Sequence, residues 1–390
     1  MLNQANIAAR MAAIQPFHVM AILARARQLQ EQGRDIFHLE VGEPDFPTPQ
    51  PIIEAGLQAL QNGQTRYTPA CGIPALRASI AQYYQERFGI KVDPKRIIVT
   101  PGASGALQLV LSVLLNPQDE VLIPDPAYPC NRHFVRLFEA NPISIPAYAA
   151  TNYQLTVADI EQYWTDKTKM VMLATPSNPT GTTLNPTELK ALHNVVKARN
   201  GVLLVDEIYQ GLVYEGEEHS ALALGEDVWV INSFSKYFGM TGWRLGWIVA
   251  PEWAVEALER LAQNVFLCPS TPAQYAALAA FTPDARAIME ANKQILKARR
   301  DYLLPALREL GFVINSQPAG AFYIYADASH FTQDAQELCL QLLEQTGVAL
   351  TPGIDFGEFE ANTKIRFAYT TGIERLEKAV TLLKNYLPRS

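Results

Sequence analysis

Short apolar runs and amphipathic stretches alternate through the middle of the chain. Runs typical of strands occur at 97–100, 120–124, 142–146, 169–174, 202–206, 228–232 and 245–250. Between several of them, as at 106–115 and 186–199, apolar residues recur at helical spacing. A continuous apolar run such as 202–206 fits a parallel strand that is covered on both faces. The pattern therefore predicts an α/β fold with a mostly parallel central sheet between helices.

The two ends of the chain predict a smaller α+β region. The N-terminal part contains a helix at 17–29 and a short strand at 36–41, and a long helix at 285–310 leads into the C-terminal part. That part contains strands at 312–315, 320–325 and 364–368 and helices at 333–347 and 373–387. Because 390 residues exceed the usual size of one hydrophobic core, we expect two domains. The predicted division is an N-terminal arm with part of the small domain at 1–45, a large domain at 46–284 and a small C-terminal domain at 285–390.

Composition narrows the possible partners. The 32 basic and 39 acidic residues give a net charge of −7, which argues against a nucleic-acid or anionic-membrane surface. The chain has no apolar run long enough to span a membrane and no secretory signal pattern, so we expect a cytoplasmic protein. The four cysteines form no C-x-x-C pair, which suits reduced thiols, and the six histidines lack ligand spacing, so we expect no metal site.

The segment 233–247 carries the strongest chemical signal. Lys236 follows an apolar strand and has Ser233, Ser235 and Arg244 near it in the sequence. Hydroxyls and a guanidinium beside a partly desolvated amine suit an anionic ligand that the amine attacks. The alternative is a strand end with one solvated lysine and glycines that only turn the chain.

Further candidates follow the ends of the predicted strands, where open α/β sheets bind small molecules. Gly102, Ala103 and Ser104 begin a helix whose backbone N–H groups favour an anion, although the turn is neither G-x-G-x-x-G nor a Walker loop. Tyr128 can lie flat on a heterocycle, or it can pack on the core. Asp206 ends an apolar strand and, if buried, needs a cation or a polar cleft.

These residues resemble those of a known family. Ser-x-Ser-Lys followed by Gly-Met-Thr-Gly-Trp-Arg-Leu-Gly at 233–246 is similar to the cofactor-lysine motif of the class I aminotransferases, in the aspartate aminotransferase superfamily. Asn-Pro-x-Gly at 178–181 and Asp-x-x-Tyr at 206–209 resemble the same family, and the order is kept through nearly the whole chain. The resemblance implies a fold-type I enzyme that uses pyridoxal 5'-phosphate and moves an amino group from an L-amino acid to a 2-oxo acid by a ping-pong mechanism.

The resemblance also implies a role for each matching residue. Lys236 would carry the cofactor and act as the base, Asp206 would keep the ring nitrogen protonated, and Tyr209 and Asn178 would hold the phenolic oxygen. Tyr128 would stack on the ring. The phosphate would be held by Gly102, Ala103, Ser104, Ser233, Ser235 and Arg244. Arg366 would grip the substrate carboxylate, with Gly42 and Asn178 beside it. Tyr67 would reach the phosphate of the neighbouring subunit, which requires a homodimer.

Other functions stay open from the sequence. A lyase acting on carbon–sulfur bonds would share the cofactor residues, and a regulator with an aminotransferase-like domain or a non-catalytic binding protein would share the fold. For the substrate, some dicarboxylate-specific relatives place a basic residue where this chain has Ser104. Its absence favours neutral or aromatic amino acids, although Arg25 or Lys293 could serve instead.

Overall fold

The computed structural model describes residues 7–14, 16 and 18–388. Its centre is a seven-stranded sheet in the order β2-β8-β7-β6-β5-β3-β4. The strands are β2 (Ile97–Thr100), β3 (Glu120–Asp125), β4 (Asn141–Pro146), β5 (Thr168–Ala174), β6 (Val202–Asp206), β7 (Trp229–Ser233) and β8 (Gly246–Val249). β8 runs antiparallel to both of its neighbours, and the pairs from β7 to β4 are parallel. The predicted, mostly parallel sheet is therefore confirmed.

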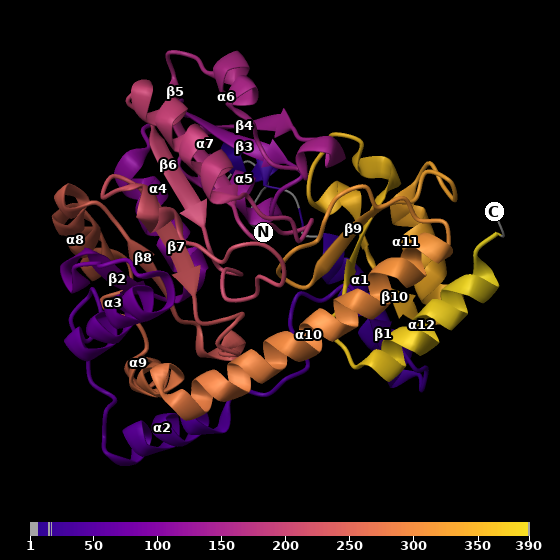
Figure 1. The fold of residues 1–390 in the computed structure, drawn as a ribbon, viewed down its shortest axis with the longest axis horizontal. Coiled ribbons are helices and arrows are strands. Elements are labelled where there is room, and N and C mark those ends of the chain that lie inside the picture. The colour runs from indigo at the N-terminus through magenta and orange to yellow at the C-terminus, as the bar shows by residue number, and fades with distance from the viewer. Residues whose placement is uncertain (1–6, 15, 17, 389–390) are drawn as a thin grey trace.

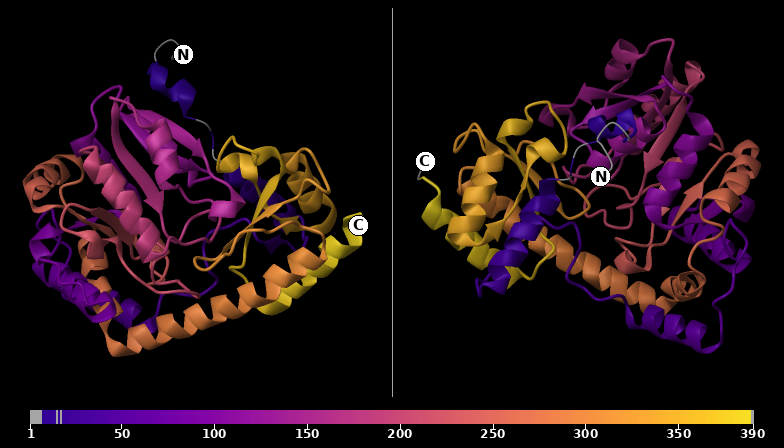
Figure 2. Two further views of the ribbon diagram at one scale, coloured as in Figure 1. Left: turned by 45° about the horizontal axis from the view of Figure 1, so that its top comes forward. Right: turned by 180° about the vertical axis from the view of Figure 1, so that it is seen from behind.

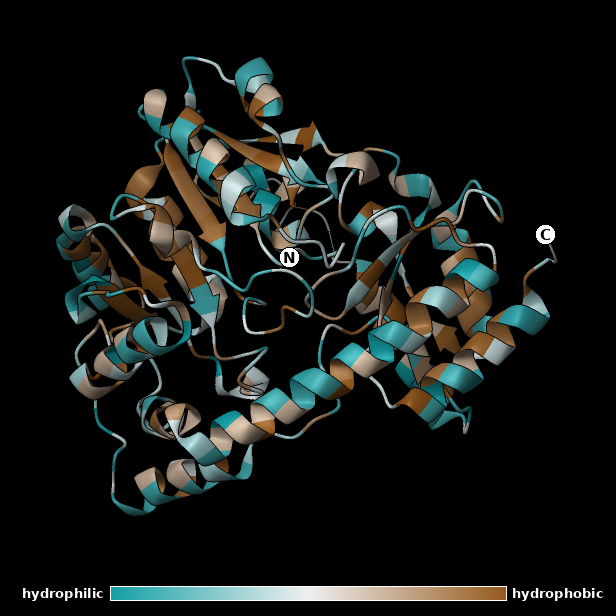
Figure 3. Cartoon of the chain, viewed as in Figure 1, coloured by the Kyte–Doolittle hydropathy of each residue, from teal (hydrophilic) through white to brown (hydrophobic). Residues whose placement is uncertain are grey.

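Side chains of the central strands are buried alternately on the two faces of the sheet. On β6, Leu203 and Val205 join a cluster with α3 (Pro74–Phe88), α6 (Val157–Tyr163), α7 (Pro186–Ala198) and α9 (Thr271–Leu278). Leu204 points the other way, into a cluster with α4 (Gly102–Leu114), α5 (Pro129–Leu137) and α8 (Val255–Val265). Helices thus cover both faces of a sheet whose central strands are mainly apolar (Figures 2 and 3). Each fully buried Leu or Val side chain contributes roughly 1.5–3 kcal/mol.

A smaller region packs at one side of the sheet and combines both ends of the chain. The 27-residue helix α10 (Pro283–Glu309) runs from α9 to this region (Figure 1). The antiparallel strands β11 (Thr351–Pro352), β12 (Lys364–Ala368) and β9 (Tyr323–Asp327) lie there with α11 (Ala335–Thr346) and α12 (Ile373–Tyr386). β1 (Phe37–His38) pairs in parallel with β10 (Val348–Ala349), and α1 (His18–Glu31) packs on β10 and β11. N-terminal residues therefore complete the smaller region, whereas the domain boundaries remain a prediction.

Two predicted strands of this smaller region differ in the structure. Residues 312–315 form only one bridge, between Val313 and Asp327. The strand predicted at 320–325 begins at Tyr323, because Ala321 has a left-handed φ of 55° that breaks the extended backbone. The N–H groups of Gly320 and Ala321 donate to the carbonyls of Gly181 (2.8 Å) and Leu212 (2.9 Å), which belong to loops of the large region. Tertiary hydrogen bonds here replace the strand pairing that an apolar run predicts.

None of the helices in the described part of the chain is long and apolar enough to cross a membrane. The helix α2 (Gln50–Gln61) lies at the edge of the molecule and packs on α9 (Figure 1).

The contact of Gly181 with the smaller region gives a stability prediction. Gly181 has φ +68°, and an added Cβ would lie 2.6 Å from the Tyr323 carbonyl oxygen. Gly63 has nearly the same φ, +69°, with nothing within 4 Å of an added Cβ. We expect Gly63→Ala to lower the free energy of unfolding by about 1 kcal/mol, through backbone strain alone. Gly181→Ala should lower it by roughly 3 kcal/mol, because the overlap adds to that strain.

Denaturant titration of both variants measures this difference. Equal losses of stability would mean that the overlap at Gly181 relaxes without cost.

Candidate active site

A cavity of about 280 Å³ lies at the carboxyl ends of the central strands, where the smaller region meets the sheet. Its walls contain most of the candidate residues named from the sequence. These are Gly42, Ala103, Ser104, Tyr128, Asn178, Asp206, Tyr209, Ser233, Ser235, Lys236, Arg244 and Arg366. These residues are spread over more than 300 positions of the sequence, and the fold brings them together.

Two predicted residues lie outside the walls. Gly102 is behind Arg244, and its φ of +73° together with a Cβ position 2.8 Å from the Arg244 Nη2 explains why a glycine is there. Tyr67 is 82% exposed and does not line the cavity of its own chain.

Lys236 follows β7 and projects into the cavity. Its Nζ donates a 2.7 Å hydrogen bond to the Gly42 carbonyl and lies 5.7 Å from the ring centre of Phe322. The pKa of the Lys236 amine is lowered to about 8, mainly by burial. The charges of Arg366 and Arg244 contribute to this shift, and those of Glu43 and Asp206 oppose it. About a tenth of these amines is therefore unprotonated at pH 7, far more than for an ordinary lysine, and able to act as a nucleophile or base.

Asp206 ends β6 and is 6% exposed. Burial raises the pKa of its carboxyl to about 6, while the Ile208 N–H, which donates to Oδ1 at 3.0 Å, and the Lys236 charge counteract the rise. The carboxylate is thus mainly ionised at neutral pH in a place that penalises charge. A cationic partner in the cavity would be stabilised there.

Arg366 enters the cavity from β12 and is 3% exposed. Its Nη1 donates to the Asn178 Oδ1 at 2.9 Å, and its Nη2 donates to the Glu40 carbonyl at 2.6 Å. Nε has no hydrogen-bond partner among the described residues, although it is buried. A buried guanidinium with an unused N–H is suited to an anionic ligand group, above all a carboxylate.

Tyr209 and Tyr323 form a hydroxyl pair that the sequence did not predict. Their Oη atoms are 2.8 Å apart, and both side chains are buried. Tyr323 belongs to β9, and its ring centre lies 4.4 Å from the Arg366 Cζ. A Cβ on Gly42 would overlap the Tyr323 hydroxyl, so the glycine at this position makes room for the phenol. The signal in the sequence was the aromatic run after Gly320, which indicated only a strand.

The opposite end of the cavity collects hydrogen-bond donors. Ala103 and Ser104 open α4, so their backbone N–H groups have no partner within the helix. The Ser233 Oγ donates to the Ser235 Oγ at 3.0 Å, and Arg244 lies beside them in the wall. β8 packs closely here, since a Cβ on Gly246 would lie 2.8 Å from the Ala103 nitrogen. A helix N-terminus, two hydroxyls and a guanidinium together make an anion site.

The described residues contain no group of three or more His, Cys, Asp or Glu side chains that could hold a metal ion.

Comparison with known proteins identifies the family. A family model described as aminotransferase class I and II matches residues 34–383. The chain is 37% identical to the valine–pyruvate aminotransferase of Mycobacterium tuberculosis over 382 residues, 97% of each chain. It is 33% identical to the aspartate aminotransferase of Bacillus subtilis over 394 residues, 98% of this chain and 99% of that one. A crystal structure of an aminotransferase from Mycobacterium tuberculosis matches with a TM-score of 0.95 and 36% identity, covering 98% of this chain and 99% of that chain.

The chain therefore belongs to the class I and II aminotransferase family. It has the fold of the fold-type I enzymes and is an aminotransferase (EC 2.6.1). These findings confirm the family, the fold class and the reaction class that the segment 233–247 indicated. The particular amino acid does not follow from the family, because the two named relatives differ in substrate at similar identity.

The depressed pKa of Lys236 gives a prediction for the protein without cofactor. Modification of Lys236 by a small amine-reactive reagent should have a midpoint near pH 8, well below that of an ordinary lysine near 10.5. Asp206→Asn should move the midpoint lower still, because it removes a negative charge that favours the ammonium form. Mass spectrometry of the Lys236 peptide measures the rate, with exposed lysines of the same digest as the internal control. A midpoint near that of the exposed lysines would contradict the desolvation argument.

Proposed function

We propose that this aminotransferase is a cytoplasmic homodimer that uses pyridoxal 5'-phosphate and prefers amino donors with a neutral side chain. The observation that carries the cofactor assignment is the charge pattern of one cavity. It combines a partly buried lysine of depressed pKa, a buried carboxylate, a guanidinium with an unused N–H and a helix N-terminus. A ligand with an aldehyde, a basic ring nitrogen and a phosphate matches these groups.

The residues fit the cofactor at each of its polar positions. Asp206 would face the ring nitrogen and keep it protonated, which also relieves the unfavourable burial of its own charge. The N–H groups of Ala103 and Ser104, the hydroxyls of Ser233 and Ser235 and the Arg244 guanidinium would hold the phosphate. Gly102 would support Arg244 from behind. Tyr128 would cover one face of the ring, and Tyr209 and Asn178 would donate to its phenolic oxygen.

When bound, the cofactor supplies an electron sink for the bonds at the amino acid's α-carbon. The chain supplies position and proton transfer. Arg366 would hold the carboxylate of the amino acid, beside Gly42 and Asn178, so that the α-hydrogen faces the cavity. Lys236, once free, would take this proton as the base, a task that its pKa of about 8 suits at neutral pH. The cofactor would also carry the amino group between the two halves of the reaction. The amino acid would exchange its amino group for the oxygen of a water molecule and leave as the first 2-oxo acid, and a second 2-oxo acid would then receive the amino group with release of water.

Apolar side chains in the wall of the cavity support a neutral substrate side chain. Val19, Met20 and Leu23 of α1 line the cavity together with Leu107 and Ile208. Among the described residues, the basic side chains in the wall are Lys236, Arg244 and Arg366, each with a role already proposed. A second substrate carboxylate would be desolvated there without a cationic partner.

The two basic residues considered as alternatives are engaged elsewhere. Arg25 forms an ion pair with Glu344, and the Lys293 Nζ lies 3.6 Å from the Glu218 carboxylate. Neither lines the cavity. The valine–pyruvate aminotransferase among the relatives also supports a neutral donor.

A homodimer is proposed because Tyr67 does not line the cavity of its own chain. Tyr67 is 82% exposed, and Val265 and Leu267 elsewhere in the chain are 55% exposed each, so the chain has large apolar side chains available for an interface. In a twofold dimer Tyr67 would reach the phosphate end of the partner's cavity.

A donor screen tests the reaction and the substrate class. With pyridoxal 5'-phosphate and either pyruvate or 2-oxoglutarate, valine, leucine and phenylalanine should exceed aspartate in kcat/KM by roughly tenfold or more. The products should be the 2-oxo acid of the donor and the aminated acceptor. Lys236→Ala is the inactive control.

The same screen separates the alternatives. Release of pyruvate, ammonia and a thiol from a cysteine conjugate would establish a lyase, and aspartate with 2-oxoglutarate as the fastest pair would refute the neutral donor. Protein that stays colourless with the cofactor would remove the cofactor assignment.

Subunit mixing tests the shared site. Lys236→Ala and Tyr67→Ala should each have low activity alone, but a hybrid dimer has one site with both native residues. Unfolding and refolding an equal mixture should therefore restore about a quarter of the wild-type activity per subunit, since half of the dimers are hybrids with one good site each. A mixture no more active than the mean of the two variants would place Tyr67 in its own subunit's site or outside any site.

A further inference from the structure

We propose that Tyr323 is a positioning residue that orients the Tyr209 hydroxyl and links it to Arg366, the proposed carboxylate site. This inference rests on the proposed function, because it assigns Tyr209 to the cofactor. Tyr323 contacts both residues: its Oη lies 2.8 Å from the Tyr209 Oη, and its ring centre lies 4.4 Å from the Arg366 Cζ. Tyr323 thus contacts both the residue proposed to bind the cofactor oxygen and the residue proposed to bind the substrate carboxylate.

The direction of the hydroxyl pair follows from its surroundings. When Tyr209 donates its proton to a ligand oxygen, its own oxygen is free to accept from Tyr323. Burial raises the pKa of both phenols, but it raises that of Tyr209 further, which makes Tyr323 the stronger donor. A donor behind Tyr209 polarises its O–H bond and strengthens the hydrogen bond that it makes in turn.

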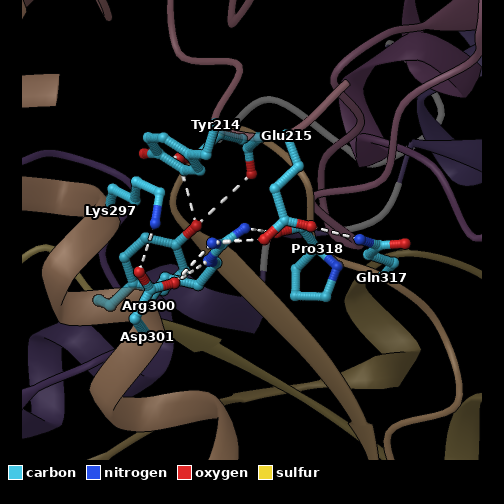
Figure 4. Close-up of polar contacts among 10 residues, drawn as sticks. Tyr214, Glu215, Lys297, Arg300, Asp301, Gln317 and Pro318 are labelled. Atoms are coloured by element: carbon cyan, nitrogen blue, oxygen red, sulfur yellow. Dashed lines mark hydrogen bonds and ion pairs between the residues drawn. The ribbon is translucent and has the colours of Figure 1, made fainter. Parts of the chain in front are cut away.

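The backbone before Tyr323 is held by contacts with α10 and with a loop of the large region. Figure 4 shows Arg300 of α10 between two loops: its Nη2 lies 2.7 Å from the Glu215 Oε1, and its Nη1 donates to the Pro318 carbonyl at 3.0 Å. The Tyr214 hydroxyl donates to the Ala321 carbonyl, two residues before Tyr323. Arg300 is 3% exposed, so this ion pair is desolvated on the arginine side.

The loop that contains Tyr214 and Glu215 also contains Tyr209. Glu207 accepts from the Ser220 Oγ at 2.9 Å and from the Ala221 N–H at 2.6 Å, which closes the loop 207–221 at its base. Tyr209 and Tyr214 both lie on this loop, so one closed segment holds Tyr209 and the backbone of its hydroxyl partner. This arrangement suits a positioning residue, because Tyr323 acts through Tyr209 and Arg366.

The test uses the visible absorbance of the protein loaded with pyridoxal 5'-phosphate, which reports the protonation state of the Lys236 nitrogen. Tyr323→Phe keeps the ring over Arg366 and removes the hydroxyl. A weaker Tyr209 donor stabilises the neighbouring oxygen anion less, so the titration midpoint should rise by roughly 0.5 pH unit. Tyr325→Phe is the matched control, since it removes another buried phenol from β9, and it should leave the midpoint unchanged.

A double-mutant comparison separates positioning from a general structural effect. In a Tyr209→Phe background, Tyr323→Phe should no longer shift the midpoint, because the effect passes through the Tyr209 hydroxyl. Tyr323→Leu, which also removes the ring, should raise KM for the amino donor roughly fivefold, whereas Tyr323→Phe should change KM by less than about twofold.

The outcomes distinguish this inference from the proposed function. No shift in Tyr323→Phe, or the same shift in both backgrounds, would overturn the role of Tyr323 in a protein that still binds the cofactor. A protein that shows no visible absorbance with the cofactor would instead contradict the proposed function itself.

Discussion

The burial of the Lys236 amine among other charged groups is the constraint on which the site depends. An ammonium group is destabilised when it is taken out of water. No carboxylate pairs with the Lys236 ammonium at close range in the described residues, so the pKa of this amine is lowered. The Gly42 carbonyl accepts its hydrogen bond, and Arg366 and Arg244 add to the shift. The buried apolar strand β7, which ends just before this lysine, limits the access of water from that side.

The cavity exists because two regions of the chain meet there. The parallel strands β5, β6 and β7 deliver polar residues to one edge of the sheet, but the sheet alone would leave that edge open. Gly42, Tyr323 and Arg366 come from the N-terminal and C-terminal segments and close it. The hydrogen bonds from Arg366 to Asn178 and from Gly320 to Gly181 cross between the regions. The geometry of the site therefore follows the relative position of the two regions, which α10 and its Arg300 contacts help to fix.

The sequence predicts those parts of the molecule that local pattern determines. Asp206 could be placed at a ligand site because an apolar strand that ends in an acid cannot leave that acid unpaired inside a sheet. Lys236 and its serines were found in the same way, and their resemblance to a known motif gave the reaction class. Strand order and the start of β9 could not be predicted, because they depend on contacts between distant residues. The left-handed backbone of Ala321, two residues before Tyr323, occurs where the N–H groups of Gly320 and Ala321 donate to the distant loops at Gly181 and Leu212.

The hydrogen bonds of Arg366 bear on how a substrate carboxylate would bind in the proposed reaction. The guanidinium has five N–H donors, and its contacts to Asn178, to the Glu40 carbonyl and to the Thr351 hydroxyl use three of them. The Thr351 contact, at 3.3 Å, is the longest, and Nε has no partner in the described chain. A carboxylate that accepts from Nε and Nη2 would form two short, charge-assisted bonds and displace only that long contact. The bonds to Asn178 and Glu40 would survive, so the arginine would keep its orientation as the ligand arrives.

Preorganisation of this kind lowers the entropy lost on binding, and it requires a rigid support for the guanidinium. The ring of Tyr323 against one side of Arg366, and that of Phe356 at 4.7 Å from its Cζ, provide such support.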